Sequence, residues 1–146
     1  MNNSKPEQAV ATFKQSLACS QAVLATFAPE LGLERDTALK LAAGFGGGMG
    51  RMGNTCGAVT GAFMVIGLRH GGTSGQDLEA KTKTYATVRE FVKQFQAKHG
   101  CIGCNELLGC DISTPEGYEK AKQSGAFANL CPQFVHTAAE ILEALG

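Results

Sequence analysis

Residues 55–68 read Thr-Cys-Gly-Ala-Val-Thr-Gly-Ala-Phe-Met-Val-Ile-Gly-Leu and make up the longest apolar stretch of the chain. Small residues recur along it at helical spacing, as at Gly57 and Gly61, so a neighbouring backbone can approach closely on that side. The opposite side carries large apolar residues, which need a hydrophobic layer. The segment is too short to cross a bilayer, which takes roughly 20 residues. It is therefore predicted to be a central, buried helix.

The rest of the chain also spaces its apolar residues at helical intervals and nowhere sustains an alternation with a period of two. Asp36, Thr114-Pro115 and Cys131-Pro132 are predicted to start helices. The predicted helices cover residues 6–27, 36–44, 55–68, 77–99, 115–122 and a last segment from residue 131 onwards. We therefore expect an all-α fold, a compact bundle of five or six helices in a single domain of residues 1–146, with a central helix rich in glycine and alanine.

The overall composition limits the classes of partner. The chain has 146 residues, 44% of them apolar, and its 13 basic and 13 acidic side chains cancel. Because no run of lysine or arginine occurs, neither a nucleic acid nor a membrane surface is an expected partner. The first residues, from Met1 to Gln8, lack the apolar core of a signal peptide. We therefore expect a cytoplasmic protein without membrane insertion.

Six cysteines are the chemically distinctive residues of the chain. In a reducing cytoplasm, clustered thiols are more often metal ligands or cycling redox groups than permanent disulfides. Cys56 precedes the central helix and Cys131 precedes Pro132, so both are expected at helix N-termini, where unpaired amides and the helix dipole stabilise a thiolate. A single cysteine is as often a small buried apolar residue, but six in one chain favour a chemical role.

The spacing of the cysteines excludes several common sites. Cys101 and Cys104 form a C-x-x-C pair, yet no strand precedes it as in thioredoxins, and no second close pair completes a zinc ribbon. Ferredoxins place most ligands in one loop, and this chain does not. Residues 48–53 match G-x-G-x-x-G, but outside a βαβ unit the match indicates close backbone packing rather than a dinucleotide site. A shared cysteine site must therefore be assembled from several helices.

Taken in order, these motifs resemble those of the C_GCAxxG_C_C family of redox-active proteins. The similarity runs over nearly the whole chain, from Cys19-Ser-Gln-Ala-Val-Leu through the glycine run, Thr55-Cys56-Gly-Ala-Val-Thr-Gly61-Ala and Cys104-Asn-Glu-Leu-Leu-Gly109 to Cys131-Pro132. Aligned on Cys56, the core reads Thr-Cys-Gly-Ala-Val-Thr where the family label has Gly-Cys-Ala-x-x-Gly, so it departs from the label at the alanine position and at both glycine positions. The cysteine itself stays in register.

The resemblance implies redox roles for the four family cysteines, which would also be the ligands of a bound metal or cluster: Cys19, Cys56, Cys104 and Cys131. It leaves two extra thiols that could resolve a disulfide, Cys101 and Cys110. The family is also similar to part of the split-Soret cytochromes, which carry haem and have been associated with an iron–sulfur centre. Because Asn105 follows Cys104, the haem attachment sequence C-x-x-C-H is missing, and no covalent haem is expected.

The sequence is compatible with two redox chemistries and, as an alternative, with a binding function. The four thiols carry electrons either through an iron–sulfur cluster or by dithiol–disulfide exchange with an unidentified redox partner. In the alternative, the chain is a binding module for a small ligand or metal ion, with Gly57 and Gly61 as contact positions and the cysteines sensing or inert. Close packing at these glycines can be internal or between subunits, so the sequence leaves a homo-oligomer open. It also leaves open whether the chain is an enzyme.

Overall fold

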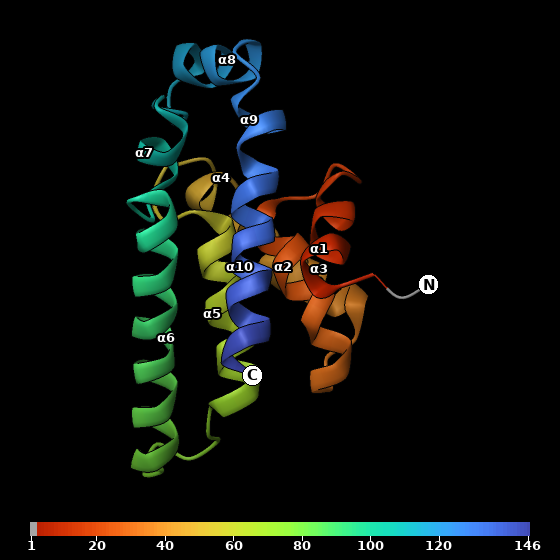
Figure 1. Ribbon diagram of the computed structural model, residues 1–146, viewed down its shortest axis with the longest axis vertical. Helices are drawn as coiled ribbons and strands as arrows, with labels where there is room; N and C mark the ends of the chain where they lie inside the picture. The colour runs from red at the N-terminus through yellow and green to blue at the C-terminus, as the bar shows by residue number, and fades with distance from the viewer. Residues whose placement is uncertain (1–2) are drawn as a thin grey trace.

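The computed structural model describes residues 3–146, and every regular element in that range is helical (Figure 1). The elements are α1 (Lys5–Phe13), α2 (Cys19–Phe27), η1 (Ala28–Leu31), α3 (Arg35–Ala42), η2 (Ala43–Phe45), α4 (Gly46–Met49), α5 (Gly57–His70), α6 (Leu78–His99), α7 (Cys104–Leu108), α8 (Pro115–Gln123), α9 (Ala126–Asn129) and α10 (Cys131–Leu145), where η marks 3₁₀ helices. A lone bridge between Thr55 and Gly103 is the strand-like pairing in this range. The predicted all-α class is confirmed.

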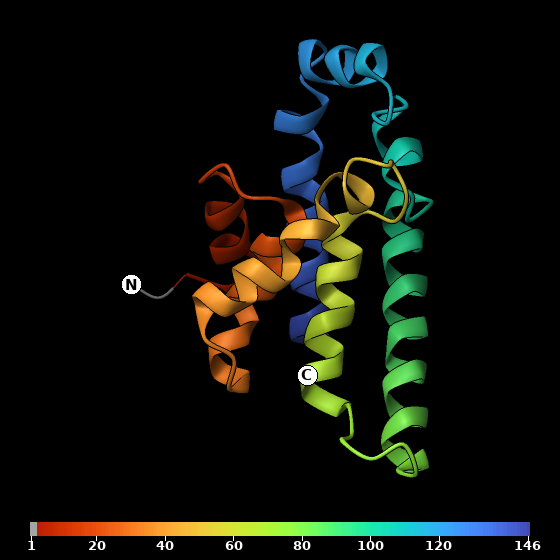
Figure 2. The same cartoon turned by 180° about the vertical axis from the view of Figure 1, so that it is seen from behind.

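Helix α5 lies between two groups of helices (Figures 1 and 2). On one side α6 and α10 pack against it and against each other. On the other side α2 packs against it, and α1 and α3 pack against α2. The short helices α4, α7, α8 and α9 gather at one end of the bundle, drawn at the top of Figure 1. Because α5 and α10 both start at this end, it collects helix N-termini.

Two glycines on α5 allow the close approach of α2. A Cβ atom on Gly61 would lie 2.8 Å from the carbonyl oxygen of Ser20, and one on Gly57 would lie 2.9 Å from the backbone nitrogen of the same residue. Both distances are shorter than real Cβ contacts, so only glycine fits at these positions. The close packing predicted here is therefore internal to the chain.

The opposite side of α5 contacts an aromatic layer. Phe63 of α5 meets Phe91 of α6 edge to face, with ring centroids 6.2 Å apart, and Phe91 stacks on Phe95 at 6.0 Å. Phe95 in turn lies 6.3 Å from Phe134 of α10. Phe91 and Phe95 are fully buried. Aromatic contacts of this geometry add to the burial of apolar surface, and they join α5, α6 and α10 into one core.

Residues 6–27, predicted as one helix, form two. Helix α1 ends at Phe13, and the chain reverses through Ser16, whose φ of 67° is left-handed, before α2 begins at Cys19. The start of α2 is fixed by Gln21, whose Oε1 accepts a hydrogen bond from the Ala18 backbone N–H at 2.9 Å. The reversal lets α1 pack against α2 and α10, which a single straight helix would not allow.

The predicted helix starts are correct in one case and wrong in another. Thr114 caps α8, with its hydroxyl accepting from the Gly117 N–H at 3.0 Å. Asp36 does not cap α3, which begins at Arg35 after Glu34, and the Glu34 side chain makes no capping bond. The predicted number of five or six helices is approximate, because α4, α7 and α9 are too short to give a periodic pattern. Within residues 3–146, no helix is long and apolar enough to cross a membrane.

Candidate functional site

Four of the six cysteines stand at helix starts. Cys19, Cys104 and Cys131 are the first residues of α2, α7 and α10, and Cys56 is the N-cap residue of α5. The first amides of a helix lack intrahelical partners, and the positive end of the helix dipole lies there. For Cys56 and Cys131, the predicted position at a helix N-terminus is confirmed.

Backbone contacts bring these helix starts together. The Cys56 N–H donates to the Ile102 carbonyl at 2.7 Å, and the Cys104 N–H donates to the Asn54 carbonyl at 2.6 Å. The two segments therefore run side by side and place Cys56 next to Cys104. A Cβ atom on Gly57 would lie 3.3 Å from the Cβ of Cys19, so the start of α2 lies against the start of α5.

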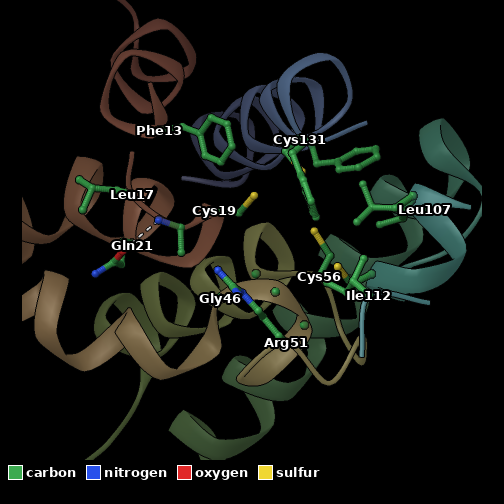
Figure 3. A pocket seen from close by; sticks show the side chains of 18 of the residues that line it. Phe13, Leu17, Cys19, Gln21, Gly46, Arg51, Cys56, Leu107, Ile112 and Cys131 are labelled. Atoms are coloured by element: carbon green, nitrogen blue, oxygen red, sulfur yellow. Dashed lines mark hydrogen bonds between the residues drawn. The ribbon is translucent and has the colours of Figure 1, made fainter. Parts of the chain in front are cut away.

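All four of these side chains line one cavity of about 960 Å³ (Figure 3). Cys56, Cys104 and Cys131 are buried, with 3%, 8% and 8% of their surface exposed, and Cys19 is half-buried. Figure 3 shows Cys19, Cys56 and Cys131 pointing toward the same space from three different elements. Every one of these cysteines is a free thiol. The cavity therefore gathers nucleophilic groups from α2, α5, α7 and α10.

The pKa of the Cys56 thiol is lowered from its ordinary value. A hydrogen bond from Cys19 lowers the pKa of Cys56, and the backbone amides of Ala58 and Val59 lower it further, against the opposing effect of burial. These donors stabilise the thiolate because they supply the hydrogen bonds that water supplies to an exposed thiolate. Cys56 is therefore the side chain of this group that is best suited to act as a nucleophile.

Its neighbours hold their protons. The hydrogen bond with Cys131 raises the pKa of Cys19 well above its ordinary value, and the hydrogen bond with Cys56 and burial act in the same direction. Burial, with the nearby charges of Cys56 and Cys131, raises the pKa of Cys104 to about 12. Cys56 therefore loses its proton more readily than Cys19 or Cys104 does.

The arrangement is not that of a formed metal site. Within the described part of the chain, no group of three or more His, Cys, Asp or Glu side chains is placed so that it could hold a metal ion. Four thiolates would suit an iron–sulfur cluster chemically. Here, however, the influence of Cys19 and Cys56 on each other shifts their pKa values in opposite directions, and the pKa of Cys104 is raised mainly by burial.

Of the other site residues predicted from the sequence, one lines the cavity and three do not. Gly57 lines the cavity, whereas Gly61 packs against Ser20 of α2. Cys101 and Cys110 are partly buried and do not line the cavity. The geometry therefore brings four of the six predicted thiols together and leaves these two outside.

Three cationic side chains at the cavity were not predicted: Lys14, Arg51 and Lys122. Arg51 stacks on the ring of Tyr118, with its guanidinium carbon 4.3 Å from the ring centroid. Its φ of 63° is left-handed, a conformation that the glycine-rich surroundings accommodate. The glycine run was the one feature of the sequence that could have indicated the position of Arg51. Nothing in the neighbouring sequence distinguishes Lys14 or Lys122 from other surface lysines.

Comparison with known proteins gives one result that covers nearly the whole chain. The family model described as "Putative redox-active protein (C_GCAxxG_C_C)" matches residues 17–145, a range that contains all four cysteines of the cavity. No curated protein and no solved structure matches the chain significantly. The order of the motifs along the sequence agrees with the matched range. The chain belongs to the C_GCAxxG_C_C family.

Proposed function

We propose that the chain transfers electrons by thiol–disulfide exchange, with Cys56 as the attacking thiolate and Cys19 as the resolving thiol. The observation that carries this proposal is that Cys19 and Cys56 stand at adjoining helix starts and line one cavity, where the pKa of Cys56 is lowered and that of Cys19 is raised. Such a pair has a nucleophile and a second thiol within reach of the same sulfur. Membership in a family described as redox-active supports the same class of chemistry.

The first step forms a mixed disulfide. The Cys56 thiolate attacks one sulfur of a substrate disulfide, a bond forms between the Cys56 Sγ and that sulfur, and the substrate S–S bond breaks. The other substrate sulfur leaves as a thiolate. The cavity admits a small molecule to Cys56, although only 3% of the surface of this residue is exposed.

The second step closes an internal disulfide. Cys19 gives its proton to the departing thiolate and attacks the Cys56 Sγ, so that a Cys19–Cys56 bond forms and the second substrate thiolate leaves and takes up a proton from solvent. The substrate gains two electrons and two protons. The Cys19–Cys56 pair supplies both electrons and the Cys19 proton, and solvent supplies the second proton. The same steps in reverse restore the dithiol when a reducing thiol is the partner.

Cys131 and Cys104 act on this pair from either side. Cys131 lines the same cavity as Cys19 and can take over the disulfide by attack on the Cys19 Sγ, which releases the Cys56 thiolate. Cys104 holds its proton and adds no second negative charge beside the Cys56 thiolate. The sequence left Cys101 and Cys110 as thiols that could resolve a disulfide. The proposal gives this role to Cys19 because neither of those two lines the cavity.

The iron–sulfur cluster stays a prediction. No step of the proposed exchange requires a cluster, and in the described residues the cysteines do not form a group that could hold a metal ion. Analysis of iron and inorganic sulfide in protein purified without oxygen distinguishes the two chemistries. Stoichiometric iron and sulfide would replace the exchange mechanism, whereas exchange by metal-free protein would support it.

Removal of the Cys19 thiol should make Cys56 less reactive at neutral pH. In Cys19→Ala the hydrogen bond to the Cys56 thiolate is lost, and hydrogen bonds to charged groups contribute about 1.5–3 kcal/mol. The pKa of Cys56 then rises, and alkylation of Cys56 by iodoacetamide at pH 7 should slow roughly tenfold, since each 1.4 kcal/mol is a factor of ten. The rate is measured by mass spectrometry of the Cys56 peptide as a function of pH.

The matched control for this experiment is Cys19→Ser. Its hydroxyl still donates a hydrogen bond, so the pH midpoint for alkylation of Cys56 should stay close to that of the wild type. The wild-type midpoint itself should lie below that of an ordinary cysteine. Equal profiles for Cys19→Ala and the wild type would contradict the proposed pairing of these two residues.

A further inference from the structure

The mouth of the cavity is positively charged. Lys14, Arg51 and Lys122 line it, and all three are exposed, whereas three of the four thiols beneath them are buried. They come from different parts of the chain: the residue after α1, the loop after α4, and α8. Folding therefore places three separate cations around one opening.

No acidic side chain offsets these charges locally. Among the described residues that line the cavity there is no aspartate or glutamate. The two ion pairs found in residues 3–146 are Lys5 with Glu30 and Lys98 with Glu140, so the cations at the mouth are not paired with carboxylates. Because the net charge of the whole chain is zero, these three cations are a local excess of positive charge at the cavity.

The Arg51 side chain is positioned by an aromatic ring and a glycine. Its guanidinium carbon lies 4.3 Å from the centroid of the Tyr118 ring, and that ring lies 5.2 Å from the ring of Phe127. A Cβ atom on Gly47 would lie 2.8 Å from the Arg51 Cγ, so the glycine leaves room for the arginine side chain. Figure 3 shows Arg51 on the same side of the cavity as Gly46. A stacked guanidinium loses less freedom when it binds an anion.

The size and walls of the cavity suit a small molecule. Its volume of about 960 Å³ is within the range of roughly 300–1,000 Å³ that is typical of small-molecule sites. Aromatic residues such as Phe13, Tyr118 and Phe127 form part of its wall. A ligand can therefore contact apolar walls in its middle and cations at its charged ends.

We infer that the cavity selects small disulfides that carry carboxylate groups. This inference rests on the proposed exchange at Cys56 and adds the substrate class: a low-molecular-weight dianionic disulfide, with its S–S bond directed toward the buried thiols and its carboxylates against Lys14, Arg51 and Lys122. This disulfide is the oxidant in the proposed exchange with Cys56 and Cys19. It gains two electrons and two protons and is released as two thiols.

Three disulfides of similar size test the inference: the dianion dithiodipropionate, the neutral hydroxyethyl disulfide and the dication cystamine. Each rate of oxidation of the chain is divided by the rate of the same disulfide with 2-mercaptoethanol, which removes intrinsic differences in reactivity. We expect the dianion to be preferred over the dication at least about tenfold at low salt, as cavities that concentrate one sign of charge raise rates by 10–10³. The preference should shrink as salt is added.

Single substitutions locate the source of the preference. Arg51→Gln, Lys14→Gln and Lys122→Gln should each reduce the ratio of the dianion rate to the dication rate roughly two- to fivefold, the effect of one exposed charge contact. The control is Lys81→Gln on α6, which changes the net charge equally but does not line the cavity. It should leave the ratio unchanged. Equal ratios for all variants, or the same loss in the control, would overturn the inference.

The inference and the proposed function can fail separately. Exchange at equal normalised rates with all three disulfides would retain the proposed function and overturn the selection for anions. If no disulfide reacts, the proposed function is wrong, and calorimetry with adipate decides the inference, since adipate is a dicarboxylate without a disulfide. Binding that weakens in Arg51→Gln and not in Lys81→Gln would support an anion site, and absence of binding would overturn it.

Discussion

A Cys56→Ser variant should exchange with hydroxyethyl disulfide on the order of 10³-fold more slowly than the wild type, a loss of the kind seen when a nucleophile is removed. Cys56 has its pKa lowered by Cys19 and by two backbone amides, and the thiolate is the reactive form. Serine has nearly the same size and forms no comparable nucleophile. It is also a preferred N-cap residue, so α5 should keep its start and the variant should fold.

The control for this substitution is Cys110→Ser. Cys110 is partly buried and lies outside the cavity, so its replacement should leave the exchange rate as in the wild type. Circular dichroism of both variants shows whether the helices are retained. A folded Cys56→Ser protein with the wild-type exchange rate would contradict the role given to Cys56.

Gly61→Ala should destabilise the fold by about 3 kcal/mol, at the upper end of the usual cost of overpacking a well-packed core. The added methyl would lie 2.8 Å from the Ser20 carbonyl oxygen and 3.2 Å from the Cβ of Val23. Neither contact is with the flexible end of a long side chain, so α2 must move away from α5. Because Cys19 precedes Ser20, the same movement should slow thiol–disulfide exchange. Urea denaturation measures the free energy of unfolding.

Gly67 supplies the matched control in the same helix. A Cβ atom there would meet nothing within 4 Å, and replacement of a helical glycine by alanine stabilises by roughly 0.5–1 kcal/mol. Gly67→Ala should therefore raise the free energy of unfolding, whereas Gly61→Ala lowers it. Changes of the same sign and size in both variants would show that helix propensity, and not contact with α2, governs these positions.

Several helix boundaries could be predicted from the sequence, because capping residues and prolines next to the boundary determine them. Thr114 followed by Pro115 marks the start of α8, and Cys131 followed by Pro132 marks the start of α10. Gly71 follows the end of α5. Capping residues and proline act within one helical turn, so their effect does not depend on the rest of the fold.

The division of residues 6–27 into two helices could not be predicted in this way. The reversal depends on Ser16 in a left-handed conformation, and a serine gives no sign of a positive φ in the sequence. The cost of that conformation is offset by the packing of α1 against α2 and α10. Similarly, Glu34 precedes α3 without a capping bond, so tertiary contacts and not a local cap set that boundary.

Part of the candidate site could likewise be predicted from the sequence, and part depends on tertiary contacts. The placement of Cys56 and Cys131 at helix starts follows from the sequence, and so does the close backbone contact at Gly57. The pairing of Cys104 with Asn54, by contrast, depends on a backbone hydrogen bond between segments far apart in the chain. The position of the cations at the mouth could not be predicted from the sequence, because only the packing of α1 and α8 distinguishes Lys14 and Lys122 from other surface lysines.

The most direct test of the cysteine centre is a titration of the metal-free chain in thiol–disulfide buffers, with the disulfides mapped by mass spectrometry of unreduced digests. Over the range of potentials of known exchange proteins, from about −270 to −120 mV, we expect one two-electron transition in which Cys19 becomes bonded to Cys56. Six free thiols throughout that range, or a disulfide that joins only Cys101 and Cys110, would contradict the account.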